Sequence, residues 1–315
     1  MFADKLIEAI KSKNNPSVAG LDPRIEYVPS HLSEKYFNAG IDPVKAACKA
    51  ILEYNMKIID AIYDIVPAVK LQLACYEVLG EMGMSVFKET CSYAKSKNLI
   101  VIADGKRNDI GSTAQEYSKA YLGYSDIKGL KYTPFEIDAL TVNPYLGFDG
   151  IKPFIDDCLA YGKGIFVLVK TSNKSSMDIQ DLELKEGMKV YEKVSQLVDV
   201  WGGSCVGKYG YSSVGAVVGA TFPHQAQIVR QLMPRAYILV PGYGAQGASA
   251  EDASKSFNSD CLGAIVNASR SIMCAYKSEL WKGKYDEEEF AQASRAEAIR
   301  MKDDLNNAII NKHQS

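Results

Sequence analysis

The sequence predicts an α/β fold, a (β/α)8 (TIM) barrel, in which eight parallel strands close into a cylinder surrounded by helices. Eight short apolar runs recur along the chain, and the intervals between them are long enough to hold helices. Each run is apolar throughout, which is typical of parallel strands that are buried on both faces. The runs cover residues 17–21, 68–71, 99–103, 139–142, 164–169, 214–219, 236–240 and 262–266.

Amphipathic segments between these runs predict the surrounding helices. They begin with acidic residues, Pro or Ser, and cover residues 43–65, 80–97, 184–201 and 224–232. Residues 1–11 predict an N-terminal helix, because the segment is amphipathic and its acidic side chains do not fit a targeting peptide. Residues 285–315 predict a helical tail. A doubly wound open sheet is the alternative, but no Gly-x-Gly-x-x-Gly turn follows the first run.

The domain organisation follows from the absence of any break in composition. No low-complexity linker divides the chain, so we expect a single barrel domain over residues 1–315. Residues 174–189 are polar and long for a connection between a strand and a helix. We expect this segment to be a lid, since long loops at the catalytic face of a barrel often cover the site.

The bulk composition excludes several classes of partner. The net charge is −2 and no basic stripe is present, which argues against nucleic acid. No apolar run approaches the ~20 residues that span a bilayer. The seven cysteines are dispersed without a Cys-x-x-Cys pair, as is typical of reduced thiols in the cytoplasm. With only three histidines, a histidine-based zinc site or a Ser-His-Asp triad has little to build on, and we expect no metal.

The most informative stretch, residues 104–113, reads Asp-Gly-Lys-Arg-Asn-Asp-Ile-Gly-Ser-Thr and follows the third apolar run. Asp104 and Lys106 are two residues apart, so they point the same way if strand geometry continues. They would then lie at the carboxyl end of a barrel strand, where barrel enzymes hold their catalytic groups. Burying clustered charges is costly unless each is offset by a neighbour, and a protein rarely keeps such a cluster for stability alone. The pattern therefore favours a catalytic site. The alternative is a solvated run of charges at a strand end.

Polar residues also follow most of the other runs, as expected for side chains that converge on one face of a barrel. These residues are Asp22, Lys70, Asn143, Lys170, Thr171, Ser172, Asn173, Gln246, Asn267, Ser269 and Arg270. Residues 241–247 are rich in glycine, and Arg270 follows the next run. This combination predicts a phosphate site, because glycine loops expose backbone N–H groups and a guanidinium supplies the matching charge. A tight turn with a surface arginine is the alternative.

Taken in order, these motifs resemble the orotidine 5'-phosphate decarboxylase family, and specifically its bacterial second subgroup (type 2). The resemblance extends from about residue 18 to residue 276. The segments that carry it are residues 20–23, 69–70, 104–113, 142–147, 167–172, 218–221, 241–247 and 269–272. The chain departs from the family at Ala248, where glycine is common, and a positive φ there would strain an alanine.

The resemblance implies decarboxylation of orotidine 5'-monophosphate to UMP without a cofactor, the last step of de novo pyrimidine biosynthesis. It implies a homodimer with shared active sites and a charged catalytic tetrad of Lys70, Asp104, Lys106 and an Asp109 that reaches in from the other subunit. Lys106 would donate the proton to C6. It also implies the substrate contacts: Asp22 and Lys70 on the ribose, Thr113 with Asp109 in the shared site, Ser172 on the pyrimidine, and Gln246, Gly247 and Arg270 on the 5'-phosphate.

Two other functions compete with this interpretation. The magnesium-dependent keto-gulonate phosphate decarboxylases and hexulose phosphate synthases share the Asp-x-Lys-x-x-Asp motif. They place a metal-binding acid at the end of the second strand, where this chain has Lys70, a cation that would repel magnesium. A catalytically silent nucleotide-binding protein on the same barrel is the other alternative, since a fold does not establish an activity.

Overall fold

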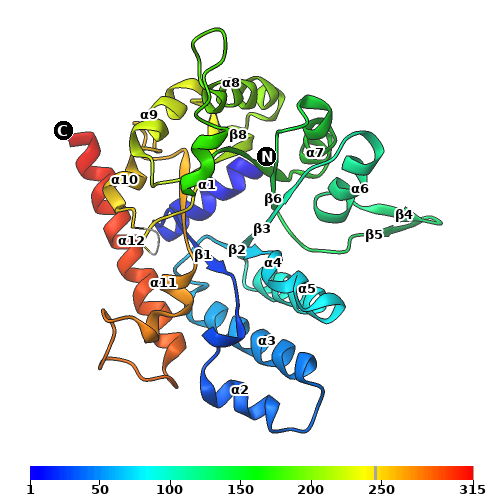
Figure 1. The fold of residues 1–315 in the computed structure, drawn as a ribbon, viewed down its shortest axis with the longest axis vertical. Coiled ribbons are helices and arrows are strands. Elements are labelled where there is room, and N and C mark those ends of the chain that lie inside the picture. Colours follow the sequence, from blue (N-terminus) through cyan, green and yellow to red (C-terminus); the bar gives the residue numbers. More distant parts are fainter. Residues whose placement is uncertain (245–246, 315) are drawn as a thin grey trace.

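A computed structural model describes residues 1–244 and 247–314 of the chain. Eight parallel strands close into a barrel in the order β1-β10-β9-β8-β7-β6-β3-β2, which confirms the predicted fold (Figure 1). The barrel strands are β1 (Ser17–Leu21), β2 (Ala68–Gln72), β3 (Ile100–Arg107), β6 (Ala139–Val142), β7 (Gly164–Lys170), β8 (Ser212–Val218), β9 (Ala236–Val240) and β10 (Ala264–Ala268). All eight predicted apolar runs therefore coincide with or overlap a strand.

Three strands extend beyond the predicted runs and carry polar residues of the cavity described below. β2 continues to Gln72 and β10 continues to Ala268. β3 continues to Arg107, and its register against β6 shifts between Ala103 and Arg107. Such an irregularity changes the direction of side chains next to it, and irregularities of this kind are common beside active sites.

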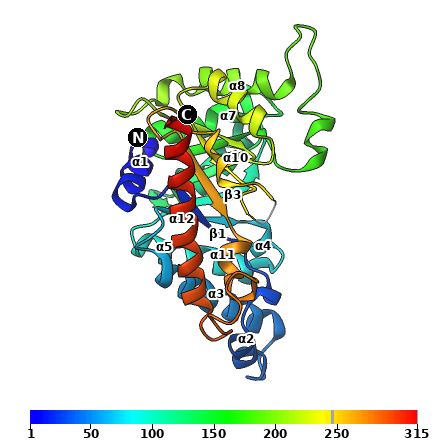
Figure 2. The ribbon, with the colours of Figure 1, turned by 90° about the vertical axis from the view of Figure 1, so that its left-hand side faces the viewer.

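Helices pack around the barrel (Figures 1 and 2). They are α1 (Phe2–Lys13), α2 (Ser30–Phe37), α3 (Pro43–Ile62), α4 (Ala74–Glu77), α5 (Gly80–Ser96), α6 (Gly111–Tyr121), α7 (Phe148–Tyr161), α8 (Val190–Trp201), α9 (Pro223–Leu232), α10 (Ala250–Ser254), α11 (Arg270–Met273) and α12 (Phe290–Gln314). Local signals define their ends. At α3, Asp42 accepts a hydrogen bond from the backbone N–H of Lys45 at 3.0 Å, and Pro43 occupies the first turn.

The predicted start of the helix at residue 184 is wrong, because α8 begins at Val190. The backbone N–H of Leu184 donates to the carbonyl of Met188 at 2.8 Å, and Gly187 between them has a φ of 75°. This reversed turn uses the hydrogen-bonding groups that a helix would need. Glu192 then closes a capping box on Lys189 and starts α8.

A short antiparallel hairpin, which the sequence pattern did not predict, leaves the barrel between α6 and β6. Its strands are β4 (Ser125–Ile127) and β5 (Leu130–Tyr132), and Figure 1 shows them at the edge of the molecule. Five of their six residues are exposed. Strands that bury no face need no alternation of apolar and polar residues, which is the pattern that identifies a strand from sequence.

The hydrophobic core consists of two apolar clusters. The larger lies between the strands and the helices, and the smaller fills the inside of the barrel. Helix α1 contributes to the inner cluster with Phe2, Leu6 and Ile7, and the ring of Phe2 meets Phe166 of β7 edge-on. Because α1 packs into the barrel in this way, the space for a ligand lies toward the carboxyl ends of the strands.

The tail forms α12, which lies along α3, α10 and α11 on the outside of the barrel (Figure 2). The predicted tail of residues 285–315 thus contains a helix that begins at Phe290. Across the residues described, no helix combines the length and the apolar character needed to cross a bilayer.

Candidate active site

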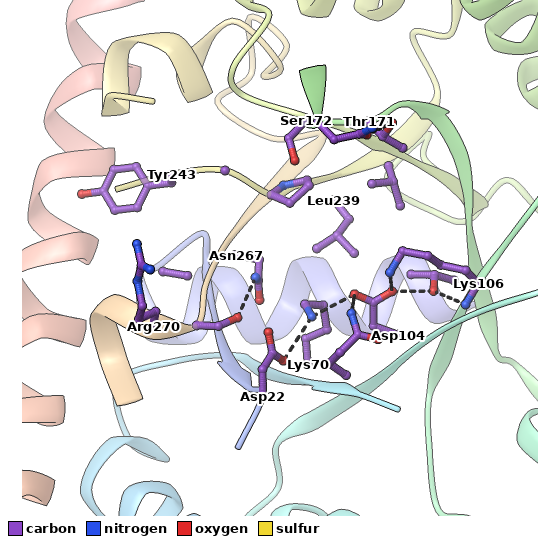
Figure 3. A pocket seen from close by; sticks show the side chains of 18 of the residues that line it. Asp22, Lys70, Asp104, Lys106, Thr171, Ser172, Leu239, Tyr243, Asn267 and Arg270 are labelled. Carbon is purple, nitrogen blue, oxygen red and sulfur yellow. Dashed lines mark hydrogen bonds and ion pairs between the residues drawn. The ribbon is translucent and has the colours of Figure 1, made fainter. Parts of the chain in front are cut away.

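A cavity of about 640 Å³ opens at the carboxyl ends of the barrel strands. Ten of the polar residues singled out in the sequence line it: Asp22, Lys70, Asp104, Lys106, Thr171, Ser172, Asn173, Asn267, Ser269 and Arg270. The charged side chains of Asp22, Lys70, Asp104 and Lys106 form a row along one side (Figure 3). Thr171 and Ser172 lie on the opposite side, and Arg270 is at the far end from Lys106.

The carboxylate of Asp104 is the centre of the charged row. Oδ2 accepts hydrogen bonds from Nζ of Lys70 at 3.0 Å and from Nε2 of Gln72 at 3.2 Å. Oδ1 accepts from Nζ of Lys106 at 2.7 Å and from Oγ1 of Thr141 at 2.8 Å. Asp104 is 8% exposed. Burial alone would raise the pKa of this carboxyl, but the charges of Lys70 and Lys106 reverse the effect and hold the pKa well below its ordinary value.

Lys70 is the most deeply buried charge of the row, with 4% of the residue exposed. Its ammonium lies 3.0 Å from Oδ2 of Asp104 and 3.5 Å from Oδ1 of Asp22. Burial by itself lowers the pKa of Lys70, and the charges of Asp104 and Asp22 outweigh burial and raise it above the ordinary value. The row therefore alternates acid, base, acid and base, and its buried part stays ionised at neutral pH.

Lys106 has an unusual backbone conformation, with a φ of 48° in the left-handed region. For a residue with a Cβ atom this costs roughly 1–2 kcal/mol. The backbone N–H of Lys106 donates to Oγ1 of Thr141 at 2.9 Å, so Thr141 holds both the backbone of Lys106 and its partner Asp104. Strain that the surroundings maintain in this way is common where a side chain must point at a ligand.

The opposite wall is held by a buried ion pair. Lys170 at the end of β7 has no exposed surface, and its Nζ lies 3.0 Å from both carboxylate oxygens of Asp181. Gln180 accepts from the backbone N–H of Thr171 at 2.9 Å. Ser172 follows in the chain and packs against Gly219, where a Cβ atom would lie 2.8 Å from Cα of Ser172. The predicted lid, residues 174–189, is thus tied to the barrel at its base.

The glycine-rich loop follows β9. Gly242, Gly244 and Gly247 all have positive φ, and the N–H of Gly244 donates to the carbonyl of Ala248 at 3.0 Å. Ala248 is not among the non-glycine residues with positive φ in the described chain, so the strain considered for it does not arise. Gln246 lies outside the described residues. Gly247 is exposed and is not one of the cavity-lining residues.

Asp109 and Thr113 do not line this cavity. Asp109 accepts a hydrogen bond from the backbone N–H of Ile110 at 2.8 Å, and Thr113 is exposed near the start of α6. Asp109 is half-buried. The chain by itself brings together three members of the expected tetrad, Lys70, Asp104 and Lys106.

The lining residues that the sequence did not single out individually include Gln72, Thr141 and Tyr243. The only sequence signal at Thr141 is a hydroxyl within the apolar run of residues 139–142, and it does not identify the contacts that Thr141 makes. Asn267 carries a buried side-chain oxygen with no hydrogen-bond partner in the described part of the chain. A buried acceptor of this kind at a cavity wall is open to a donor from water or a ligand.

The described residues contain no group of three or more His, Cys, Asp or Glu side chains placed to hold a metal ion. On β2, the residue that lines the cavity with a charged side chain is Lys70. The charged row at the cavity centre has two carboxylates and two ammonium groups, and each ammonium group is paired with a carboxylate.

Comparisons with known proteins agree with this geometry. The family model of orotidine 5'-phosphate decarboxylase / HUMPS matches residues 21–279. A relative named orotidine 5'-phosphate decarboxylase from Caldicellulosiruptor saccharolyticus is 46% identical over 98% of this chain and 99% of its own length. One of the same name from Rhodopirellula baltica is 43% identical over 96% of this chain and 98% of its own length.

Solved structures show the same similarity. The structure of Leishmania donovani OMP decarboxylase aligns with a TM-score of 0.72 and 27% identity, covering 98% of this chain and 99% of that one. The resemblance inferred from the sequence motifs is confirmed. The chain with this barrel and this row of charges belongs to the orotidine 5'-phosphate decarboxylase family.

Proposed function

We propose that this chain decarboxylates orotidine 5'-monophosphate to UMP without a cofactor, as the last step of de novo pyrimidine biosynthesis. The observation that carries the proposal is the carboxylate of Asp104, held in the cavity between the ammonium groups of Lys70 and Lys106 at 3.0 and 2.7 Å. Relatives that are named for this reaction and cover nearly the whole chain support it.

The charges account for the chemistry. When the bond between C6 and the carboxylate breaks, CO2 leaves and the electron pair stays on C6 in an orbital that the pyrimidine ring does not delocalise. Lys106 stabilises this charge with its ammonium and then transfers a proton to C6, which yields UMP. Solvent returns the proton to Lys106, whose side chain is 43% exposed without ligand.

Asp104 and Lys70 hold Lys106 in place. Asp104 accepts from both ammonium groups, and Thr141 fixes the carboxylate and the backbone of Lys106 together. Charges fixed before the reaction need little rearrangement as the carbanion forms. The family resemblance puts the leaving carboxylate near Asp104, which would then act by repelling that group, by orienting Lys106, or by both.

The remaining contacts are those that the family resemblance implies, and the lining of the cavity is compatible with them. Asp22 and Lys70 hold the ribose hydroxyls, and Ser172 on the opposite wall contacts the pyrimidine (Figure 3). Arg270 at the far end, with Gln246 and Gly247, binds the 5'-phosphate. Since the phosphate is remote from C6, its binding energy can close residues 174–189 over the site and offset the desolvation of the charges.

The active form is a homodimer with shared sites, in which Asp109 and Thr113 enter the partner's cavity. The support is the family resemblance together with three exposed apolar side chains, Val78, Tyr145 and Ile110, with exposures of 78%, 81% and 55%. These residues follow β2, β6 and β3, which are neighbours in the barrel, so their loops meet at one side of the cavity mouth. Exposed patches of this kind mark association surfaces.

The enzyme works in the cytoplasm. All seven cysteines carry free thiols, and four of them are buried in the core, where they pack as small apolar side chains. A chain of this size with dispersed, reduced thiols is typical of a reducing compartment.

The test is the ultraviolet absorbance of orotidine 5'-monophosphate mixed with the purified protein in EDTA, with no added cofactor. A fast fall of the orotate band with UMP as product supports the proposal and separates it from the magnesium-dependent relatives. Binding without any fall would favour a silent nucleotide-binding protein. Neither binding nor reaction would overturn the proposed substrate.

A further inference from the structure

The glycine-rich loop after β9 has an anchor outside the cavity. Tyr243 belongs to this loop and is 4% exposed. Its ring points away from Lys70 and Asp104 toward α12, the helix at the left of Figure 3. Its hydroxyl donates to Oδ2 of Asp304 on α12 at 2.5 Å. The loop is thus tied through one side chain to a helix more than fifty residues later in the chain.

The acceptor on α12 is itself held by a network. Nη2 of Arg300 lies 3.4 Å from the hydroxyl of Tyr243, and Nη1 lies 3.8 Å from Oδ2 of Asp304. Glu297, which is 3% exposed, receives two hydrogen bonds from Arg300 at 2.7 and 2.8 Å. Trp281 donates its indole N–H to the same carboxylate at 3.0 Å. Arg300, held by Glu297, thus lies next to both the phenol of Tyr243 and the carboxylate of Asp304.

The described part of the loop is rich in glycine. Three glycines with positive φ lie between Pro241 and Ala248, and glycine has the largest conformational freedom to lose. A second tie lies just beyond the loop, where Nζ of Lys312 donates to the carbonyl oxygens of Ser254 and Phe257 at 3.1 and 2.7 Å. Helix α12 therefore holds the loop at Tyr243 and holds the segment that follows it.

We propose that Asp304 is a positioning residue for the phosphate end of the substrate: through Tyr243 it holds the glycine-rich loop in the conformation that binds the phosphate. The inference rests on the proposed function, which assigns the 5'-phosphate to this loop and Arg270. Asp304 touches no part of the nucleotide and acts through the loop alone. Its effect must therefore appear with phosphorylated ligands and not with the nucleoside.

Adjacent aspartates on α12 provide a matched pair of variants. Asp303 is exposed and makes no hydrogen bond or ion pair with the described residues, so Asp303→Ala is the control for Asp304→Ala. Asp304→Asn keeps an acceptor for the hydroxyl of Tyr243 and serves as the conservative variant. Titration calorimetry with UMP and with uridine measures the phosphate-dependent part of binding, and the melting temperature shows that each variant is folded.

We expect Asp304→Ala to weaken UMP binding about tenfold and to raise the KM for orotidine 5'-monophosphate more than it lowers kcat. Uridine binding stays unchanged, and Asp304→Asn and Asp303→Ala bind UMP within about twofold of the wild type. Unchanged UMP affinity in folded Asp304→Ala, or equal weakening of UMP and uridine, would overturn the role of Asp304. A wild-type protein that binds UMP no better than uridine would instead overturn the assignment of the phosphate to the loop.

Discussion

Two inactive variants should restore activity to one another if the active sites are shared between subunits. Lys106 lines the cavity of its own barrel, whereas Asp109 lies outside that cavity. Lys106→Ala therefore disables the site in its own barrel, and Asp109→Ala disables the site of its partner. In a mixed dimer both defects fall on the same site, and the other site has an intact Lys106 and an intact Asp109.

The expected recovery follows from this arrangement. Random reassembly of equal amounts of the two variants puts about half of the dimers in the mixed form, and each mixed dimer has one intact site of two. Activity should therefore rise from near zero to about a quarter of the wild-type value. The assay is orotate absorbance after unfolding and refolding the variants together, with variants refolded separately as the control. No recovery, despite subunit exchange proven by mass spectrometry, would refute the shared site.

Three further predictions concern the charges of the cavity and its wall. The pKa of Asp104 lies below its unfolded value of about 3.9, so its carboxylate adds stability above that pH and loses it as the pH falls toward the folded pKa. The difference in unfolding free energy between wild type and Asp104→Asn should accordingly narrow from pH 6 to pH 3 in urea titrations, and a constant difference would contradict this. Asp181→Leu leaves Lys170 buried without its partner and should destabilise the fold by about 3–5 kcal/mol, whereas Lys170→Met with Asp181→Leu should recover most of the loss. A double variant as unstable as the single one would count against a buried ion pair. Arg270→Ala should weaken UMP binding by about 1.5–3 kcal/mol and leave uridine binding unchanged, and equal losses for both ligands would argue against a phosphate contact.

The sequence predicted the barrel because each strand is buried on both faces and is therefore apolar along its whole length. It did not predict the turn at residues 184–188. The amphipathic pattern of residues 184–189 runs without a break into that of α8, and the turn depends on the positive φ of Gly187. The hairpin of β4 and β5 was also missed, because its three-residue strands are exposed and carry no periodic signal.

The charged residues of the site were predictable because they follow apolar runs directly, and parallel strands end on one face of a barrel. Gln72 and Thr141 were not, because their roles depend on register between strands. Gln72 pairs with Asp104 across β2 and β3, and the shift in register between β3 and β6 brings Thr141 to the backbone of Lys106. The hydrogen bond from Tyr243 to Asp304 was not predictable either, because it depends on how α12 packs against the barrel.

The most direct test of the proposed chemistry is the decarboxylation rate of Lys106→Ala, measured together with its affinity for UMP. Proton donation contributes about 10²–10⁴-fold and a preorganised charge about 10²–10³-fold, so the rate should fall by about 10⁴-fold or more while UMP still binds. That result would identify Lys106 as the group that acts on C6. Near-normal turnover by Lys106→Ala would contradict the account and show that another group donates the proton.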